Sequence, residues 1–260
     1  RPIACLLSGG LDSSIITALV NKHYNSAQRL NTFSIGMEGS DDLKHAKIVA
    51  DYLGTQHTEI IFDADNFFKA IPEVINAIES YDTTTVRASV GNYLIGKYIS
   101  QNTDAKVIFN GDGSDEVTGG YLYFLEAPDD LEFDNECRRL ISNIHTFDVL
   151  RSDRCISSNG LEPRTPFLDK AFVNYYMSLP AKIRNPKSSN SDCMCEKKLL
   201  RQAISECAPD ILPHEIVWRT KEAFSDGVSG NSGSWYNIIQ KMVENCNTTI
   251  SEEWSHNMPT

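Results

Sequence analysis

The sequence predicts an α/β fold in which a parallel sheet is covered by helices on both faces, followed by a mostly helical C-terminal half. Two observations predict it: short apolar runs alternate with longer amphipathic runs in the first half of the chain, and strand patterns fade after Phe124. Such alternation indicates parallel strands joined by right-handed crossovers. In these sheets, ligands bind at the carboxyl ends of the strands.

The expected elements follow one another in order along the first half. Strands are expected at Ile3–Leu7, Thr32–Ile35, Glu59–Phe62 and Lys106–Asn110. Helices are expected after Asp12 and at Asp41–Leu53, Asp65–Ile78 and Arg87–Gln101; Ser40 is a candidate N-cap and Gly54 a stop for the second. We place a boundary between a parallel α/β part, residues 1–124, and a mainly helical part, residues 125–260, and leave open whether they share one core.

Composition limits the kind of protein this is. The 260 residues are 41% hydrophobic, which suffices for a large core, and the formal net charge is −11, which disfavours a nucleic-acid surface. No apolar run reaches the roughly 18 residues of a membrane span. Seven cysteines form an odd, irregularly spaced set, as in a reduced, cytosolic protein. We expect a cytoplasmic protein without nucleic-acid or membrane partners.

The segment SGGLDSS, residues 8–14, joins the first strand to the first helix and has the features of a phosphate loop. Gly9 and Gly10 lack a Cβ, so backbone N–H groups can approach an anion closely. The helix N-terminus adds a partial positive charge. Three hydroxyl groups offer further donors: those of Ser8, Ser13 and Ser14. The loop has neither the Walker A lysine nor the dinucleotide glycine spacing.

Asp12 is unexpected in an anion site. A cation between its carboxylate and the phosphates would explain it, and Mg²⁺ is the usual choice. The alternative is an ordinary strand-to-helix turn in which Asp12 is the N-cap. A second acidic loop, NGDGSDE at 110–116, favours the cation, because Asp112, Asp115 and Glu116 would repel one another without one. A plain acidic turn that caps the next helix remains the alternative there.

Five motifs resemble one known family. They are SGGLDSS, SYDTTTVRAS (80–89), GDGSDEVTGGYLYF (111–124), LEPRTPFLD (161–169) and WRTKEAFSDGV (218–228). In this order, over nearly the whole chain, they are similar to the synthetase domain of the glutamine-hydrolysing asparagine synthetases, most like the eukaryotic form. The first motif alone indicates only the wider ATP pyrophosphatase (PP-loop) superfamily, with its adenine nucleotide α-hydrolase-like fold.

The resemblance implies a ligase that uses ATP, Mg²⁺, aspartate and ammonia. Aspartate would attack the α-phosphate to give β-aspartyl-AMP and pyrophosphate, and ammonia would displace AMP to give asparagine. By resemblance, the pyrophosphate loop is Ser8, Gly9, Gly10, Asp12, Ser13 and Ser14; further ATP contacts are Leu6, Ile35, Asn110 and Gly111. The implied Mg²⁺ ligands are Asp12 and Asp115, Lys221 reaches the phosphates, and Tyr121, Asp148 and Arg151 line the aspartate pocket.

Each of the last four residues also has a plainer interpretation. Lys221 could be an exposed loop lysine, and Tyr121 could belong to the core. Arg151 could simply pair with Asp148 three residues earlier on a helix.

The sequence departs from the family pattern at two places. The usual SGEGSDE reads NGDGSDE here, so Asp112 replaces a glutamate tied to forming or using the adenylate, and Asn110 replaces a serine. Because Asp112 is one methylene shorter, we expect an active but slower enzyme. The family's glutaminase domain, with its N-terminal cysteine nucleophile, is absent from these residues. We therefore expect a piece of a longer chain that uses ammonia by itself.

Two other functions stay open from the sequence. One is an impaired or inactive paralogue that binds nucleotide or a partner subunit, which Asp112→Glu would distinguish by whether activity is gained. The other is a different adenylating enzyme of the wider superfamily, acting on tRNA or on a β-amino acid. The sequence also leaves a homo-oligomer open.

Overall fold

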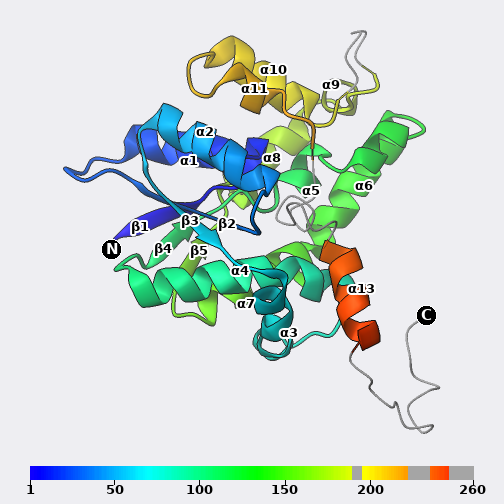
Figure 1. Cartoon of the computed structure of the whole chain (residues 1–260). Helices are drawn as coiled ribbons and strands as arrows, with labels where there is room; N and C mark the ends of the chain where they lie inside the picture. The colour runs from blue at the N-terminus through cyan, green and yellow to red at the C-terminus, as the bar shows by residue number, and fades with distance from the viewer. Residues whose placement is uncertain (189–194, 222–234, 246–260) are drawn as a thin grey trace, which may run out of the picture.

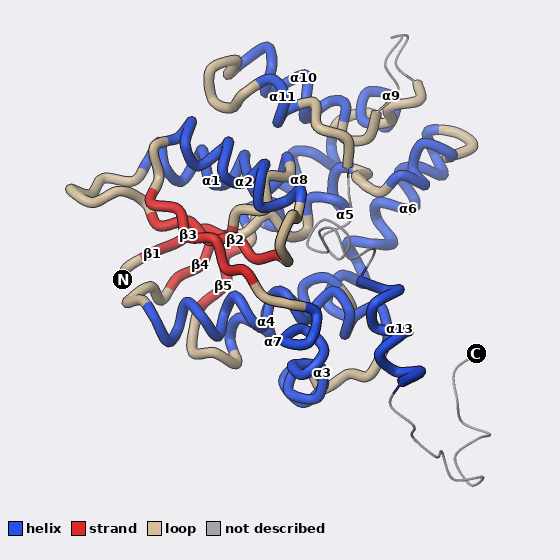
Figure 2. Tube along the Cα trace, in the orientation of Figure 1, coloured by secondary structure: helices blue, strands red, loops and turns tan. Residues whose placement is uncertain are grey.

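A computed structural model describes residues 1–188, 195–221 and 235–245, and confirms the predicted fold class. Five parallel strands form one sheet in the order β3-β2-β1-β4-β5, with helices on both faces (Figures 1 and 2). The strands are β1 (Ile3–Leu6), β2 (Asn31–Gly36), β3 (Gln56–Ile61), β4 (Val107–Phe109) and β5 (Glu162–Arg164).

The helices alternate with the strands in the first half and follow one another in the second. The α-helices are α1 (Leu11–His23), α2 (Asp41–Leu53), α3 (Ala64–Ile78), α4 (Thr83–Asn102), α5 (Ser114–Thr118), α6 (Asp130–Asn143), α7 (Asp148–Ser157), α8 (Lys170–Ser178), α9 (Ala181–Arg184), α10 (Lys198–Cys207), α11 (His214–Val217) and α13 (Trp235–Asn245). Short 3₁₀ helices are η1 (Leu122–Glu126), η2 (Ile144–Thr146) and η3 (Pro166–Leu168).

The strand order reverses beside β1. From β1 the chain passes through α1, β2 and α2 to β3 on one side, then returns through α3 and α4 to β4 on the other side. Ala4 of β1 accordingly lies opposite Asn31 of β2 and Ile108 of β4. Loops leaving β1 and β4 diverge at this switch point and open a crevice there. The two motif loops, residues 8–14 and 110–116, are the ones that leave these strands.

Two apolar cores lie on opposite faces of the sheet. One packs α1, α2 and α11 around Leu7, Ile15 and Val49, and the other packs α3, α4 and α7 around Phe33, Val90 and further buried side chains. Figure 2 shows α1 and α2 on one side of the sheet and α4 and α7 on the other. The second core also includes residues 155–161 and α13, so parts of the C-terminal half pack directly onto the α/β half.

Several predicted boundaries change for local reasons. The α2 prediction is confirmed: Ser40 accepts a hydrogen bond from the Leu43 N–H, and Gly54 ends the helix with φ 67°. Helix α4 begins four residues before the predicted Arg87, because the Asp82 carboxylate caps it by accepting a bond from Thr85 N at 2.8 Å. Strand β3 begins three residues earlier than predicted, at Gln56.

Strand β5 is absent from the sequence prediction. It has only three residues and contains Pro163, so it carries no strand pattern. Proline lacks an N–H donor and is tolerated at a sheet edge, where β5 lies beside β4.

The described part of the chain bears on two compositional predictions. Its five cysteines are free: Cys5, Cys137, Cys155, Cys195 and Cys207. Cys193 and Cys246 lie outside the described residues. Within residues 1–188, 195–221 and 235–245, none of the helices combines the length and the apolar character needed to cross a bilayer.

Candidate active site

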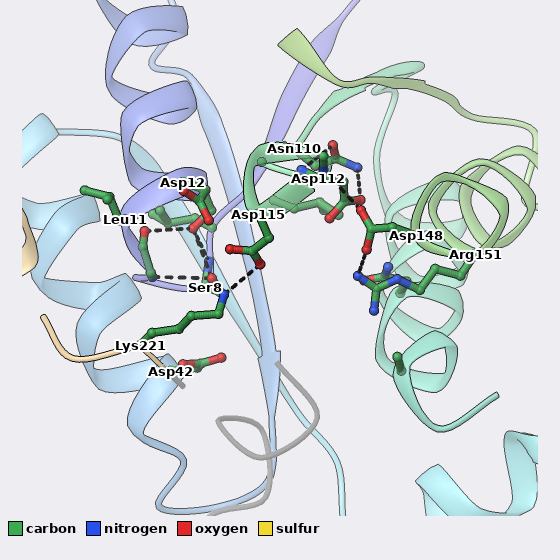
Figure 3. Close-up of a pocket in the computed structure, with 18 of the residues that line it drawn as sticks. Ser8, Leu11, Asp12, Asp42, Asn110, Asp112, Asp115, Asp148, Arg151 and Lys221 are labelled. Carbon is green, nitrogen blue, oxygen red and sulfur yellow. Dashed lines mark hydrogen bonds and ion pairs between the residues drawn. The ribbon is translucent and has the colours of Figure 1, made fainter. Parts of the chain in front are cut away.

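A cavity of about 400 Å³ lies at the carboxyl ends of β1, β2 and β4, where the strand order reverses (Figure 3). The structure brings fourteen of the sixteen residues proposed for the site to its wall: Leu6, Ser8, Gly10, Asp12, Ser13, Ile35, Asn110, Gly111, Asp112, Asp115, Tyr121, Asp148, Arg151 and Lys221. Gly9 and Ser14 do not line it.

The first loop is tightly folded on itself. The Ser13 hydroxyl accepts a bond from Ser8 N at 3.2 Å, lies 3.0 Å from the Ser8 hydroxyl and donates to Gly10 O at 3.2 Å. Gly9 adopts φ 73°, and a Cβ there would lie 2.4 Å from Ala46 N, so only glycine lets the loop pack against α2. Ser14 is fully buried. Gly9 therefore shapes the loop, while Ser8 and Ser13 border the cavity.

Asp12 is not the cap of α1. The N-cap position is Gly10, which makes no side-chain cap bond, and Asp12 lies inside the first turn. Its carboxylate instead accepts a bond from the Ser114 hydroxyl at 2.8 Å and pairs with Lys197. The partners of Asp12 thus belong to a site built from distant segments.

Two lysines neutralise the acidic centre of the cavity. The Lys197 ammonium lies between Asp12 and Asp115, 2.5 Å from Asp115 Oδ1, and Lys221 pairs with Asp115 Oδ2 at 2.6 Å. Burial favours a neutral Asp115, but both ammonium groups outweigh it and hold the pKa of its carboxyl far below the usual range. Conversely, although burial opposes charge on Lys197, Asp115 and Asp12 raise its pKa. In this structure the Lys197 ammonium is a cationic group beside Asp12, and the predicted Mg²⁺ stays a prediction.

The two motif loops touch at Gly111. A Cβ on this residue would lie 2.7 Å from Ser13 N and 2.8 Å from the Asp12 carbonyl carbon. A larger residue would force the loops apart. The glycine therefore keeps the first loop and the second loop in one wall of the cavity.

Asp112 is held by the residue two positions before it. Asn110 donates from Nδ2 to Asp112 Oδ2 at 2.8 Å and accepts from Asp112 N at 3.3 Å. Burial and the nearby Asp148 charge raise the pKa of Asp112 to about 6.

Asp148 and Arg151 form the opposite wall (Figure 3). They form an ion pair with each other on α7, and Asp148 also accepts a hydrogen bond from Gly113 N at 3.1 Å. The two residues therefore form the helix ion pair of the plainer interpretation and also line the cavity. Tyr121 donates its hydroxyl proton to the buried Glu116. Burial and the Asp148 charge raise the pKa of Glu116 to about 8, so this carboxyl is largely protonated at neutral pH.

Buried ion pairs anchor the segment that carries Lys221. Arg219 pairs with Asp42 of α2 at 2.9 Å, and both side chains are at most one-tenth exposed. Arg201 of α10 pairs with Glu196 and donates to Val217 O at 2.5 Å. Lys221 itself is 18% exposed and lies 5.5 Å from the centre of the Tyr121 ring. These contacts exclude the interpretation of Lys221 as an exposed loop lysine.

Known proteins are similar to this chain over nearly its whole length. The family model described as asparagine synthase matches residues 1–132 and 125–257. The asparagine synthetases [glutamine-hydrolyzing] of Mus musculus, Homo sapiens and Gallus gallus are 51%, 50% and 49% identical over 247 residues, which is 94% of this chain. This chain belongs to the asparagine synthase family.

The chain spans 43% of the length of these relatives. One solved structure, titled as a predicted subunit of tRNA methyltransferase from Methanocaldococcus jannaschii, aligns over 68% of this chain and 75% of its own with a TM-score of 0.36 and 16% identity. That likeness is too slight to support an argument.

Several cavity residues of this asparagine synthase family chain carry no local sequence signal. Lys197, with φ 55°, precedes α10 in a run of charged residues that reads as a solvated surface. Its neighbour Glu196 and the Asp42–Arg219 pair have no local signal either. The SYDTTTVRAS motif contains four more cavity residues and could have indicated them: Thr84, Thr85, Arg87 and Ala88. Residues 222–228 of the last motif lie outside the described part of the chain.

Proposed function

We propose that this chain forms an amide bond with ATP, converting aspartate and ammonia to asparagine through β-aspartyl-AMP. The observation that carries the proposal is the meeting of a lysine-free serine-glycine loop, two carboxylates, the buried Lys197 and the part-buried Lys221 in one cavity at the switch point of the sheet. Nucleotidyl transfer depends mainly on positioning and charge neutralisation, which these groups supply.

The reaction would have two steps, and different residues of the cavity would serve the phosphates and the aspartate. Ser8 and Ser13 would bind the leaving phosphates, and Lys221 and Lys197 would offset the charge that develops when the aspartate oxygen attacks the α-phosphorus and the bond to pyrophosphate breaks. Arg151 and Tyr121 border the side of the cavity where aspartate would bind. Ammonia would then attack the acyl carbon of the adenylate, releasing AMP and one proton.

Asp12 and Asp115 fit Mg²⁺ that arrives with ATP. Both carboxylates face the one position that the Lys197 ammonium takes, and Mg²⁺ is usually held by one or two carboxylates together with substrate phosphates. Among the described residues no group of three or more acidic, histidine or cysteine side chains could hold a metal alone. Bound there, Mg²⁺ would supply charge neutralisation to the pyrophosphate.

The nitrogen source follows from the same proposal. The relatives are named for glutamine hydrolysis, and this chain covers less than half of them, so we propose that the 260 residues by themselves take ammonium as the nitrogen source. A cytoplasmic location stays a prediction of the sequence, which leaves a homo-oligomer open.

The test is pyrophosphate release with ATP, Mg²⁺, aspartate and ammonium, followed by mass spectrometry for β-aspartyl-AMP and asparagine. We expect pyrophosphate that depends on aspartate, and asparagine that depends on ammonium. Lys221→Met should abolish both, whereas Lys44→Met, which removes an exposed lysine on α2, serves as the matched control. ATP binding without aspartate-dependent pyrophosphate would refute the ligase and favour the nucleotide-binding paralogue.

A further inference from the structure

The end of β4 carries a hydrogen-bonded unit made of Asn110, Asp112 and Ser152. Asn110 is 4% exposed, and its two amide hydrogens are both used, toward Asp112 Oδ2 at 2.8 Å and Ser152 Oγ at 2.9 Å. Its Oδ1 accepts from Asp112 N at 3.3 Å. The amide therefore holds both the carboxylate and the backbone of Asp112.

The orientation of the Asn110 amide is fixed by its partners. If oxygen and nitrogen were exchanged, an amide oxygen would face the Asp112 carboxylate, and an NH₂ group would face the Asp112 N–H. Both contacts would be repulsive. Since no amide hydrogen is left for a bound molecule, the side chain of Asn110 acts on its neighbours rather than on a substrate.

The unit also ties two walls of the cavity together. Ser152 is 1% exposed and follows Arg151 on α7, the helix that also carries Asp148. Asn110 N donates to Arg164 O of β5 at 3.0 Å, so the residue is fixed by backbone as well. Asp112 thus has a fixed place relative to Asp148 and Arg151 (Figure 3).

We infer that Asn110 is a positioning residue for the Asp112 carboxylate, and that the two side chains form a matched pair in length. A serine at 110 would end one bond short of the position of Asn110 Nδ2, and its single hydroxyl proton could not serve both Asp112 Oδ2 and Ser152 Oγ. A glutamate at 112 would carry its carboxylate one methylene beyond the amide. These are also the two positions at which NGDGSDE departs from SGEGSDE, so the departures belong together.

The inference rests on the proposed function where it concerns turnover. Misplacing a group at a reacting centre by about 1 Å costs roughly 100-fold in rate. We expect Asn110→Ser to lower kcat for aspartate-dependent pyrophosphate release by about 10-fold or more, with the KM for ATP changed by less than about 3-fold. We expect the Asn110→Ser/Asp112→Glu double variant to regain most of that loss.

Asp112→Glu is the second variant of the test, and it keeps the inference testable if Asn110→Ser does not fold. Because the side chain of residue 112 borders the cavity, the longer glutamate can be accommodated there. We expect it alone to lower kcat, contrary to the gain that the sequence suggested for an impaired enzyme. The control is Asn159→Ser, whose part-buried amide donates to Cys155 O and Tyr93 O away from the cavity; it should keep the parent kcat. An Asp112→Glu enzyme as fast as the parent, or effects of the two substitutions that simply multiply, would overturn the inference.

A crystal structure of Asn110→Ser gives a result that does not depend on activity. We expect the Asp112 carboxylate to leave its present rotamer, and an unchanged Asp112 side chain would overturn the inference. Absence of aspartate-dependent pyrophosphate from the parent chain would instead refute the proposed function, and the crystal structure would still decide the role of Asn110.

Discussion

Replacing Lys197 by methionine tests whether this lysine is the counter-ion of the cavity. The Lys197 side chain is 3% exposed, and the carboxylates on either side of it, those of Asp12 and Asp115, are 20% and 22% exposed. Removing one partner of a fully buried pair costs about 3–5 kcal/mol. Because both carboxylates keep some contact with water and Asp115 keeps Lys221, we expect a loss of about 2–3 kcal/mol in the free energy of unfolding.

The assay is urea unfolding at pH 7 and low ionic strength, with and without Mg²⁺. A loss of this size corresponds to a fall of about 4–12 °C in Tm for a chain of this length. Mg²⁺ should restore part of the stability of Lys197→Met and add less to the parent, because the two carboxylates left facing each other favour a divalent cation.

Lys44→Met is the control for the loss of a lysine. Lys44 pairs with Asp41 on the surface of α2, where both side chains are more than half exposed, so its removal should change stability by less than about 1 kcal/mol. A Lys197→Met protein as stable as the parent, or one whose stability does not respond to Mg²⁺, would refute the reasoning.

Three further predictions concern two residues of the cavity wall, Gly111 and Asp42, and the nearby Glu116. Glu116 has its pKa raised from 4.5 to about 8, so it contributes stability that is complete below pH 4.5 and is lost as the pH rises through 8. Glu116→Gln should therefore flatten the fall in the free energy of unfolding between pH 5 and 8.5. An unchanged pH dependence of that free energy, measured by urea unfolding, would contradict this. Gly111→Ala should weaken ATP binding measured by calorimetry, because its Cβ would lie 2.7 Å from Ser13 N, and should cost about 1–3 kcal/mol of stability. Asp42→Asn should weaken ATP binding about 5-fold by releasing Arg219 near Lys221; an unaltered Kd would show that the ion pair only stabilises the fold.

Local sequence patterns predict the parts of this chain that depend on local physics. The α2 helix is predicted with both ends because Ser40 and Gly54 act within a few residues of themselves. The crevice is predicted because parallel strands place their following loops at one edge. Strand β5 has no such pattern, since its three residues are defined only by their pairing with β4.

The site shows the same division. The sequence near Asp12 does not show whether its carboxylate caps the helix or faces the cavity. In the structure its partners are Ser114 and Lys197, which are 102 and 185 residues away. Asn110 and Asp112 are recognised from the sequence as two separate departures, and only the hydrogen bonds show that they are joined. Lys197 lies in a charged run typical of a surface, and only tertiary packing buries it.

Asp12 and Asp115 precede both lysines of the cavity in the chain by at least 82 residues, and this order has a consequence for synthesis. A ribosome-bound chain that has emerged as far as residue 188 holds Asp12 and Asp115 but not Lys197 or Lys221. At that stage solvent cations must balance the two carboxylates, and the later lysines exchange with them as α10 and the segment after α11 dock. We therefore expect the final step of folding to release cations and to become slower as the Mg²⁺ concentration rises.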